Sequence, residues 1–161
     1  MPELTDTLCL QCGLCCNGVL FADVRRERGD PSALFVWNGP RVPQPCPAFN
    51  GKDCTCAIYA DRPTRCHKFE CQQLLNVKDG TTTVKKALTQ IHTARKLAAK
   101  AETLLGDLGF NDKELPLSQR FQRCQRAAEN GGLPQEKFDT LADLQLAVHQ
   151  LTVLLAKEFY A

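Results

Sequence analysis

The chain has 161 residues, of which 43% are hydrophobic and 24% charged, and its formal net charge is +2. This is the composition of a soluble globular protein that can bury a core of its own, and the near-balanced charge gives no electrostatic reason to expect nucleic acid or an acidic membrane as a partner. The N-terminal residues lack the basic start and apolar run of a signal peptide, and no apolar run reaches the about 18 residues of a membrane span. We therefore expect a cytoplasmic protein.

The first sixteen residues show no helical or strand period and contain four cysteines, as expected of a loop wrapped around a ligand cluster. Two short apolar runs follow, Val19–Val24 and Ala33–Trp37, and each predicts a strand. Asn38-Gly39-Pro40 is a turn signal that ends the second run.

A proline-rich stretch leads into a predicted hairpin. Pro40, Pro43, Pro45 and Pro47 hold the chain extended through Cys46. Asn50-Gly51 is a hairpin turn signal, so we expect Cys46 to lie close to Cys54 or Cys56.

A helix is predicted to begin at Asp61-Arg62-Pro63, with Asp61 near the cap position and Pro63 in the first turn. It would carry Cys66, Phe69, Leu74 and Leu75. Cys66 and Cys71 would lie about 140° apart around a regular helix. Both can therefore serve one centre only if the helix ends or tightens between them.

The rest of the chain predicts three amphipathic helices. Apolar residues recur at three- and four-residue steps from Val84 to Leu105, from Leu117 to Ala128 and from Phe138 to Phe159. Asn130-Gly131-Gly132 closes the second helix, and Pro134 opens the third. Short loops between such helices predict an antiparallel bundle.

We therefore predict an α+β, partly irregular fold of two parts. Residues 1–78 form a small cysteine-rich, metal-binding module with short strands, and residues 79–161 form an antiparallel three-helix bundle packed against it. Asp79–Thr83 serve as linker and helix cap. A module of about 75 residues buries little apolar surface, so it leans on a metal or on its neighbour.

Nine of the ten cysteines lie in the first 71 residues. In the reducing cytosol such a density indicates metal binding rather than disulfides, and the adjacent Cys15 and Cys16 could bridge each other only through a strained ring. Closed zinc sites use four thiolates, and iron–sulfur clusters use them too. Cys9, Cys12 and Cys15 match the start of the bacterial ferredoxin run, but Cys16 breaks its register. The spacing therefore indicates thiolate ligation and leaves the metal open.

Three motifs organise the cysteines. Cys9-x2-Cys12-Gly13-x-Cys15-Cys16 opens the region, Cys46-Pro47 lies in the middle, and a closing motif runs from Cys56-Ala57-Ile58-Tyr59 through Arg62-Pro63 to Cys66, Phe69 and Cys71. The pattern resembles the bacterial cysteine-cluster proteins with a CxxCxxCC domain, often called the YkgJ family and regarded as chelators of zinc or iron. His67 stands where that family usually has arginine. The resemblance implies a metal site, not a reaction, with these ligands: Cys9, Cys12, Cys15, Cys16, Cys46, Cys56, Cys66 and Cys71.

Eight thiols suit two four-ligand centres, or one cluster and one zinc ion, and nothing in the sequence pairs them. Nearby cations should offset the thiolate charge, and the candidates are Arg62, Arg65 and Lys68. Tyr59 and Phe69 are expected to pack over the site. Of the remaining candidates, Cys124 falls on an apolar helix face as a buried core residue, and we interpret Cys54 as a spectator. We expect His67 either to hydrogen-bond to a ligand from outside the metal's coordination or to be exposed, and we expect partly exposed structural roles for His92 and His149.

Every unusual residue is a candidate ligand, and no nucleophile–base pair, phosphate loop or acid pair is recognisable. We therefore predict a structural or partner-binding metal protein rather than an enzyme, with Zn²⁺ favoured over a [4Fe-4S] cluster. The final amphipathic helix is compatible with a homodimer. The alternative is an iron–sulfur redox protein or cluster-dependent enzyme, because similar modules occur in proteins regarded as flagellin lysine N-methylases. Nucleic-acid binding would need a basic helix or interleaved aromatic and basic residues, which the chain lacks.

Overall fold

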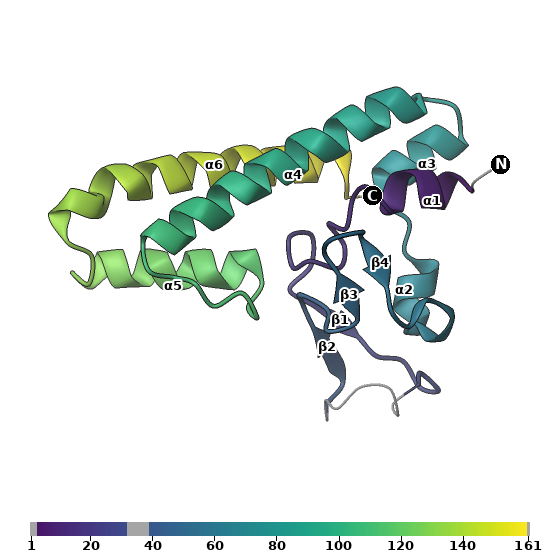
Figure 1. Ribbon diagram of the computed structural model, residues 1–161, viewed down its shortest axis with the longest axis horizontal. Helices are drawn as coiled ribbons and strands as arrows, with labels where there is room; N and C mark the ends of the chain where they lie inside the picture. Colours follow the sequence, from purple (N-terminus) through teal and green to yellow (C-terminus); the bar gives the residue numbers. More distant parts are fainter. Residues whose placement is uncertain (1–2, 32–38, 161) are drawn as a thin grey trace.

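The computed structural model describes residues 3–31 and 39–160, and places a cysteine-rich part beside a helical part (Figure 1). The cysteine-rich part contains α1 (Leu4–Cys9), β1 (Asp23–Arg25), β2 (Arg41–Pro43), β3 (Phe49–Asn50), β4 (Thr55–Cys56), the 3-10 helix η1 (Tyr59–Asp61), α2 (Thr64–Lys68) and α3 (Gln72–Lys78). The helical part contains α4 (Val84–Asp107), α5 (Leu117–Glu129), the 3-10 helix η2 (Gln135–Lys137) and α6 (Phe138–Glu158). The mixture confirms the predicted α+β class with short strands and a three-helix region.

The long helices α4 and α6 run side by side in opposite directions, and the shorter α5 lies beside the far end of α4 (Figure 1). Small alanines on the inner face of α4 let the α6 backbone approach closely. The predicted apolar periods largely match the buried faces, which are Ala87, Ile91, Ala94, Ala98, Ala101 and Leu105 on α4, and Leu144, Ala147, Leu151 and Leu155 on α6. Phe138, the predicted start of the last period, is exposed instead. Thr83 caps α4 as predicted, because its hydroxyl accepts a hydrogen bond from the Lys86 N–H at 3.2 Å.

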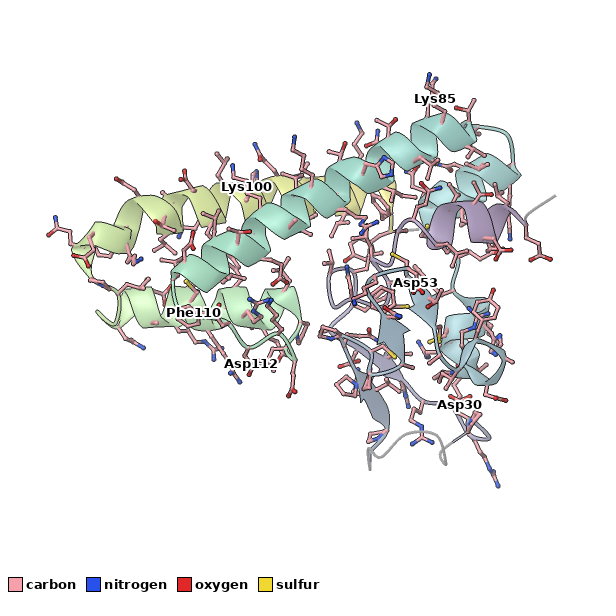
Figure 2. All side chains as sticks on the ribbon, viewed as in Figure 1. Asp30, Asp53, Lys85, Lys100, Phe110 and Asp112 are labelled. Atoms are coloured by element: carbon pink, nitrogen blue, oxygen red, sulfur yellow. The ribbon has the colours of Figure 1, made fainter. Side chains whose placement is uncertain are left out.

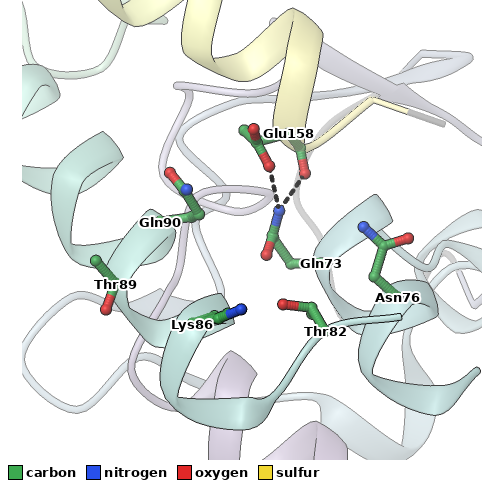
Figure 3. Close-up of a pocket in the computed structure, with 7 residues that line it drawn as sticks. All are labelled: Gln73, Asn76, Thr82, Lys86, Thr89, Gln90 and Glu158. Atoms are coloured by element: carbon green, nitrogen blue, oxygen red, sulfur yellow. Dashed lines mark hydrogen bonds between the residues drawn. The ribbon is translucent and has the colours of Figure 1, made fainter. Parts of the chain in front are cut away.

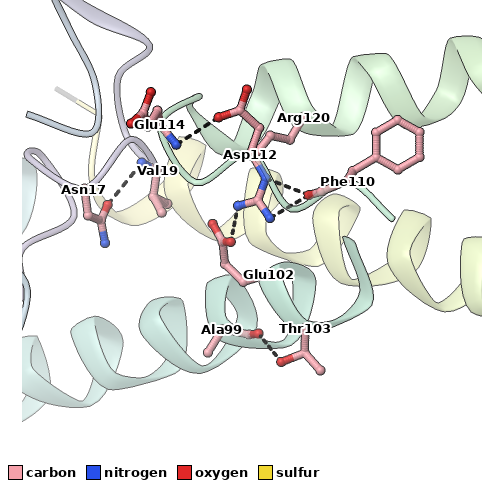
Figure 4. A network of polar contacts seen from close by, with 9 residues as sticks. All are labelled: Asn17, Val19, Ala99, Glu102, Thr103, Phe110, Asp112, Glu114 and Arg120. Carbon is pink, nitrogen blue, oxygen red and sulfur yellow. Dashed lines mark hydrogen bonds and ion pairs between the residues drawn. The ribbon is translucent and has the colours of Figure 1, made fainter. Parts of the chain in front are cut away.

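A buried arginine fixes the connection between α4 and α5 (Figure 4). Arg120 is only 2% exposed, and its guanidinium donates to the Phe110 carbonyl oxygen at 3.1 Å and 2.8 Å. The same guanidinium forms an ion pair with Glu102 of α4. A buried charge is tolerated when it is paired and hydrogen-bonded in this way.

The strands pair as two small antiparallel units. β1 pairs with β2, with Val24 opposite Val42, and β3 pairs with β4, with Phe49 opposite Cys56. The prediction of a hairpin at Asn50-Gly51 is therefore confirmed. The expected strand at Val19–Val24 is wrong in extent: pairing begins only at Asp23, because Leu20 is buried in the core. The partner of β1 lies in the proline-rich stretch, and the strand expected at Ala33–Trp37 falls outside the described residues.

The single helix expected from Asp61 onwards is wrong, because the chain forms η1, α2 and α3 in succession. Asp61 ends η1, and Pro63 occupies the N-cap position of α2. The cap itself comes from Asp30, whose carboxylate accepts from the Thr64 N–H at 2.9 Å and the Thr64 hydroxyl at 2.6 Å. The helix breaks at Phe69, whose extended backbone lets its ring pack edge-on against Phe21 at 4.9 Å.

Buried side chains from both ends of the chain share one core. Leu8, Leu14 and Leu20 of the N-terminal segment belong to the same buried cluster as Ile91 and Leu155 of the long helices. The division into residues 1–78 and 79–161 stays a prediction. In the described part of the chain, no helix is long and apolar enough to cross a membrane.

Candidate metal centre

The opening motif is a run of tight turns that follows α1 directly. The N–H of Cys12 donates to the Cys9 carbonyl oxygen at 3.1 Å, and the N–H of Cys16 donates to the Gly13 carbonyl oxygen at 3.1 Å. Gly13 adopts φ +69°, and a Cβ there would lie 2.6 Å from the Phe49 ring. Only glycine meets both demands, so the β3 ring packs directly on the turn. Leu14 is fully buried and anchors the loop, while the thiols on either side remain nearer the surface.

Backbone hydrogen bonds join the middle and closing motifs to this loop. The N–H of Cys46 donates to the Cys16 carbonyl oxygen at 2.8 Å, and the N–H of Ala57 donates to that of Ala48 at 2.8 Å. Cys66 lies on α2, and Cys71 is the N-cap residue of α3. Sulfur atoms from these separate segments gather between the opening loop, the β3–β4 hairpin and α2 (Figure 2).

Four thiols, which we call the first thiol set, influence one another's pKa values: Cys9, Cys12, Cys15 and Cys71. Cys9 is exposed, yet enough protein surrounds its sulfur for desolvation to raise its pKa to about 12, and the neighbouring Cys15 and Cys71 add to the rise. The pKa of Cys12 is also raised to about 12, first by burial and then by Cys15, Cys71 and Cys9. Because each thiolate raises the pKa of the others, the thiols do not ionise readily together on their own. A bound metal cation would stabilise their thiolate forms.

A second thiol set lies beside it: Cys16, Cys46, Cys56 and Cys66. Burial raises the pKa of Cys66 to about 11, and Cys46, Cys15 and Cys56 contribute. Burial also raises the pKa of Cys46, with a further rise from Cys56. The thiols of this set come from the opening loop, the middle motif, β4 and α2.

Cys15 and Cys16 join the two sets. Their Sγ atoms lie 3.7 Å apart. The contact between them lowers the pKa of Cys15 and raises that of Cys16. Adjacent residues thus belong to different sets.

The thiols of each set come from segments that meet, but their side chains do not point at a common metal position. Within residues 3–31 and 39–160, no three Cys, His, Asp or Glu side chains converge closely enough to hold one ion. The chemistry of the donor set still fits a soft metal, because each set is entirely sulfur. Zinc and iron–sulfur clusters take such donors, whereas magnesium and calcium require oxygen.

Arg62 is the cation of the site. Burial raises the pKa values of Cys9 and Cys66, and the Arg62 charge opposes both rises. The Arg62 side chain is held over the Tyr59 ring at 3.9 Å, donates to the Tyr59 carbonyl oxygen at 2.9 Å, and lies 3.3 Å from His67 Nδ1. Tyr59 is 55% exposed, so it positions Arg62 and does not seal the thiols from water.

The other two candidate cations face a different partner. Arg65 and Lys68 lie 3.5 Å and 3.9 Å from the carboxylate of Glu27. Phe69 packs on Phe21. Of the three candidate cations, Arg62 is the one whose charge lowers the pKa of thiols, whereas Arg65 and Lys68 pair with Glu27.

The cysteines outside the two sets occupy different settings. Cys124 is 0% exposed in the core, as predicted. Cys54 ends the hairpin loop with φ +56°, and its sulfur lies beside Gly13, 3.3 Å from where a Cβ would project. His67, His92 and His149 are exposed; for His92 and His149 this is more open than the partly exposed roles expected.

Each helix of the helical part, or the chain just after it, holds one backbone carbonyl oxygen in or just after the opening motif. Arg95 of α4 donates to Gln11 O at 2.6 Å, the N–H of Leu117 at the start of α5 donates to Gly18 O at 3.1 Å, and the hydroxyl of Tyr160, just after α6, donates to Leu20 O at 2.7 Å. These positioning residues were not predicted. No local pattern marks them, because their partners lie far away in the sequence.

Residues 8–87 match the family model of the CxxCxxCC domain, described as a putative zinc- or iron-chelating domain. The chain therefore belongs to the CxxCxxCC family. All eight cysteines of the two thiol sets fall within the matched residues, and Cys124 falls outside them. This supports a metal-binding role for the domain. Neither a comparison with curated proteins nor one with solved structures finds a match.

Proposed function

We propose that the CxxCxxCC domain of this chain holds two metal centres, one in each thiol set. Cys9, Cys12, Cys15 and Cys71 would bind the first, and Cys16, Cys46, Cys56 and Cys66 the second. The observation that carries the proposal is the mutual grouping of these thiols from distant segments, which meet at Cys15 and Cys16. On binding metal, each set would supply the four thiolates that a closed tetrahedral zinc site requires.

Zinc is the proposed metal at both centres. A closed four-thiolate zinc site does no redox chemistry and holds a fold together without any. Eight thiolates and two divalent ions leave a formal charge of about −4. Arg62 offsets part of that charge, and the backbone N–H groups of the tight turns can offset more.

The role we propose is structural and partner-binding, in the cytoplasm. Metal would hold together short segments that bury little apolar surface of their own. Leu10, 46% exposed, follows Cys9 directly, and the exposed Tyr59 supports Arg62 of the same centre. Two exposed apolar side chains beside one centre suit docking of a protein partner. A homodimer is one form that such a partner could take.

The test is metal analysis of protein purified without oxygen. We expect about two zinc ions per chain and no visible absorption band. Cobalt replacing zinc should give a thiolate-to-cobalt band, and either Cys12→Ser or Cys46→Ser should remove about half of its intensity. Complete loss of the band in both variants would contradict two separate centres.

The alternative is an iron–sulfur redox protein or cluster-dependent enzyme. The observation that favours it is the ferredoxin spacing of Cys9, Cys12 and Cys15, which the structure keeps within one thiol set together with Cys71. It predicts a brown protein with iron and acid-labile sulfide in equal amounts, bleached by dithionite. That result would replace zinc with a cluster in the first thiol set.

A further inference from the structure

A hollow lined by polar side chains lies where three helices meet, and none of the thiols lines it. α3, the turn after it, the first turns of α4 and the end of α6 surround a cavity of about 210 Å³ (Figure 3). The polar groups in its walls are amides, hydroxyls and two opposite charges, from Gln73, Asn76, Thr82, Lys86, Gln90 and Glu158. The cavity is smaller than the pockets that hold drug-sized ligands or nucleotides, so its occupant must be a small polar molecule.

The protein fixes the orientation of two of the amides. Gln73 is 2% exposed, and its Nε2 donates to the Glu158 carbonyl oxygen at 2.7 Å and to the Glu158 carboxylate at 3.2 Å. Its Oε1 therefore points the other way, into the hollow (Figure 3). Asn76 Oδ1 accepts from Gln72 Nε2 at 2.7 Å, which turns the Asn76 amide nitrogen toward the hollow. One acceptor and one donor thus face the cavity in defined positions.

The two charges stand apart across the cavity. Lys86 extends its ammonium group toward Thr82, and Glu158 lies on the opposite wall above Gln73 (Figure 3). Within residues 3–31 and 39–160, Lys86 forms no ion pair, and Glu158 pairs only with Lys157, at 3.7 Å. A cation and an anion that face one hollow without neutralising each other are both available to a ligand.

We infer that this hollow binds a small zwitterion of the free α-amino acid class. Its carboxylate would accept from Lys86, the Asn76 amide nitrogen and the Thr82 hydroxyl. Its ammonium group would donate to the Glu158 carboxylate and Gln73 Oε1. A simple anion would face the Glu158 carboxylate, and a simple cation would face Lys86, so only a ligand with both charges satisfies both walls.

The site can be tested on the protein as purified, because it uses none of the thiols. In a ¹⁵N–¹H NMR titration with L-serine and L-glutamine, shifts should concentrate at Gln73, Asn76 and the first turn of α4. Acetate and methylamine, which each carry one of the two charges, should bind at least about tenfold more weakly than either amino acid.

Charge-removing variants supply the second arm of the test. Lys86→Met and Glu158→Gln should each weaken binding by about tenfold or more, since each removes a charge-assisted hydrogen bond. Lys85→Met is the matched control, because Lys85 lies at the same helix end but does not line the hollow (Figure 2). Its affinity should stay unchanged. If Glu158→Gln disturbs folding, the affinity of Lys86→Met alone decides whether the hollow binds the amino acid, because Lys86 is exposed and its removal should leave the fold intact.

Three outcomes would overturn the inference. The first is the absence of shifts with either amino acid at millimolar concentration. The second is acetate binding as tightly as the amino acids, which would make the hollow a simple anion site. The third is an equal loss of affinity in Lys85→Met and Lys86→Met, which would reduce the effect to overall charge.

Discussion

Arg95 of α4 donates a hydrogen bond from Nη1 to the carbonyl oxygen of Gln11 at 2.6 Å. Gln11 lies between Cys9 and Cys12, so a helix of the C-terminal half directly restrains the turn that carries two thiols of the first set. Leu117 and Tyr160 restrain the same loop further along. The helical part thus acts as a scaffold for the opening motif.

Arg95→Ala should weaken this scaffold without touching a thiol. We expect a loss of about 1 kcal/mol of stability, because the bond is charge-assisted but exposed. The zinc affinity of the first thiol set should fall by the several-fold factor that about 1 kcal/mol represents. Competition with a chromogenic chelator measures the affinity, and Lys96→Ala, which alters the exposed neighbouring residue, provides the control. Equal affinities in the two variants would rule out a scaffolding role for Arg95.

Cys124 and Cys15 should behave as opposites. Cys124→Ala should keep its full metal content and lose about 1–2 kcal/mol of stability, because a buried sulfur is removed from a closely packed core. Cys15→Ser should lose metal, because Cys15 lies where both thiol sets meet. Elemental analysis and denaturant unfolding separate the two effects. Metal loss in Cys124→Ala together with retention in Cys15→Ser would contradict the assignment.

Metal removal should loosen one half of the chain more than the other. A strong chelator should abolish hydrogen-exchange protection around the opening loop, the β3–β4 hairpin and α2, because short segments there depend on the metal for order. Most of the helical circular dichroism should remain, since α4 and α6 bury a continuous apolar face against each other. Unchanged protection in the loop after complete metal removal would show that metal is not structural.

Zinc binding should release protons in a pH-dependent way. The pKa values of Cys9 and Cys12 are raised to about 12 and that of Cys66 to about 11, chiefly by burial, so these thiols are protonated at neutral pH. Binding two zinc ions should therefore expel nearly one proton per ligand, and apparent affinity should rise with pH. Calorimetry in buffers of different ionisation enthalpy counts the protons. A release of fewer than about half of the ligand number would argue against thiolate ligation throughout.

The same raised pKa values define the alkaline limit of the metal-free protein. In the folded state these thiols hold their protons more tightly than unfolded thiols do. Their contribution to stability is therefore present below the ordinary thiol pKa near 9 and is lost as pH rises toward about 12. Urea titrations of metal-free protein should show decreasing unfolding free energy across this interval. Zinc-loaded protein should lack the decrease, because the thiolates are already deprotonated.

Asp30 should stabilise α2 as a remote cap. Hydrogen bonds from Thr64 and the Glu27 N–H outweigh burial and lower the pKa of Asp30. Its contribution should be present above pH 4 and be lost below it. Asp30→Ala should cost about 1 kcal/mol and weaken metal binding by the second thiol set through Cys66. Asp23→Ala breaks only an exposed pair with Arg41 and should cost less, so similar costs in urea titrations would contradict the capping role.

The sequence predicted well where structure is decided locally. Apolar residues three and four apart identified α4, α5 and α6, and Thr83 was recognisable as a cap because its partner lies three residues away. The break between α2 and α3 could not be foreseen. It depends on Phe69 packing against Phe21 and on Asp30 capping Thr64, and both contacts cross long stretches of chain.

The candidate site shows the same division. Motif spacing selected eight cysteines as ligands, and that assignment stays a prediction. Spacing could not assign them to sets, because Cys66 and Cys71 are close in sequence but separated by the helix break, and Cys15 and Cys16 are adjacent. The buried position of Cys124 was predictable, since the period of α5 alone places it on the inner face.

The bond between Tyr160 and Leu20 joins residues 140 positions apart, which has a consequence for biosynthesis. A ribosome adding about 5–20 residues per second needs on the order of ten seconds to pass from one to the other. During that interval the opening thiols have emerged, but the hydroxyl that fixes their loop has not been made. Permanent metal capture should therefore follow translation of α6, and the nascent thiols need protection from oxidation until then.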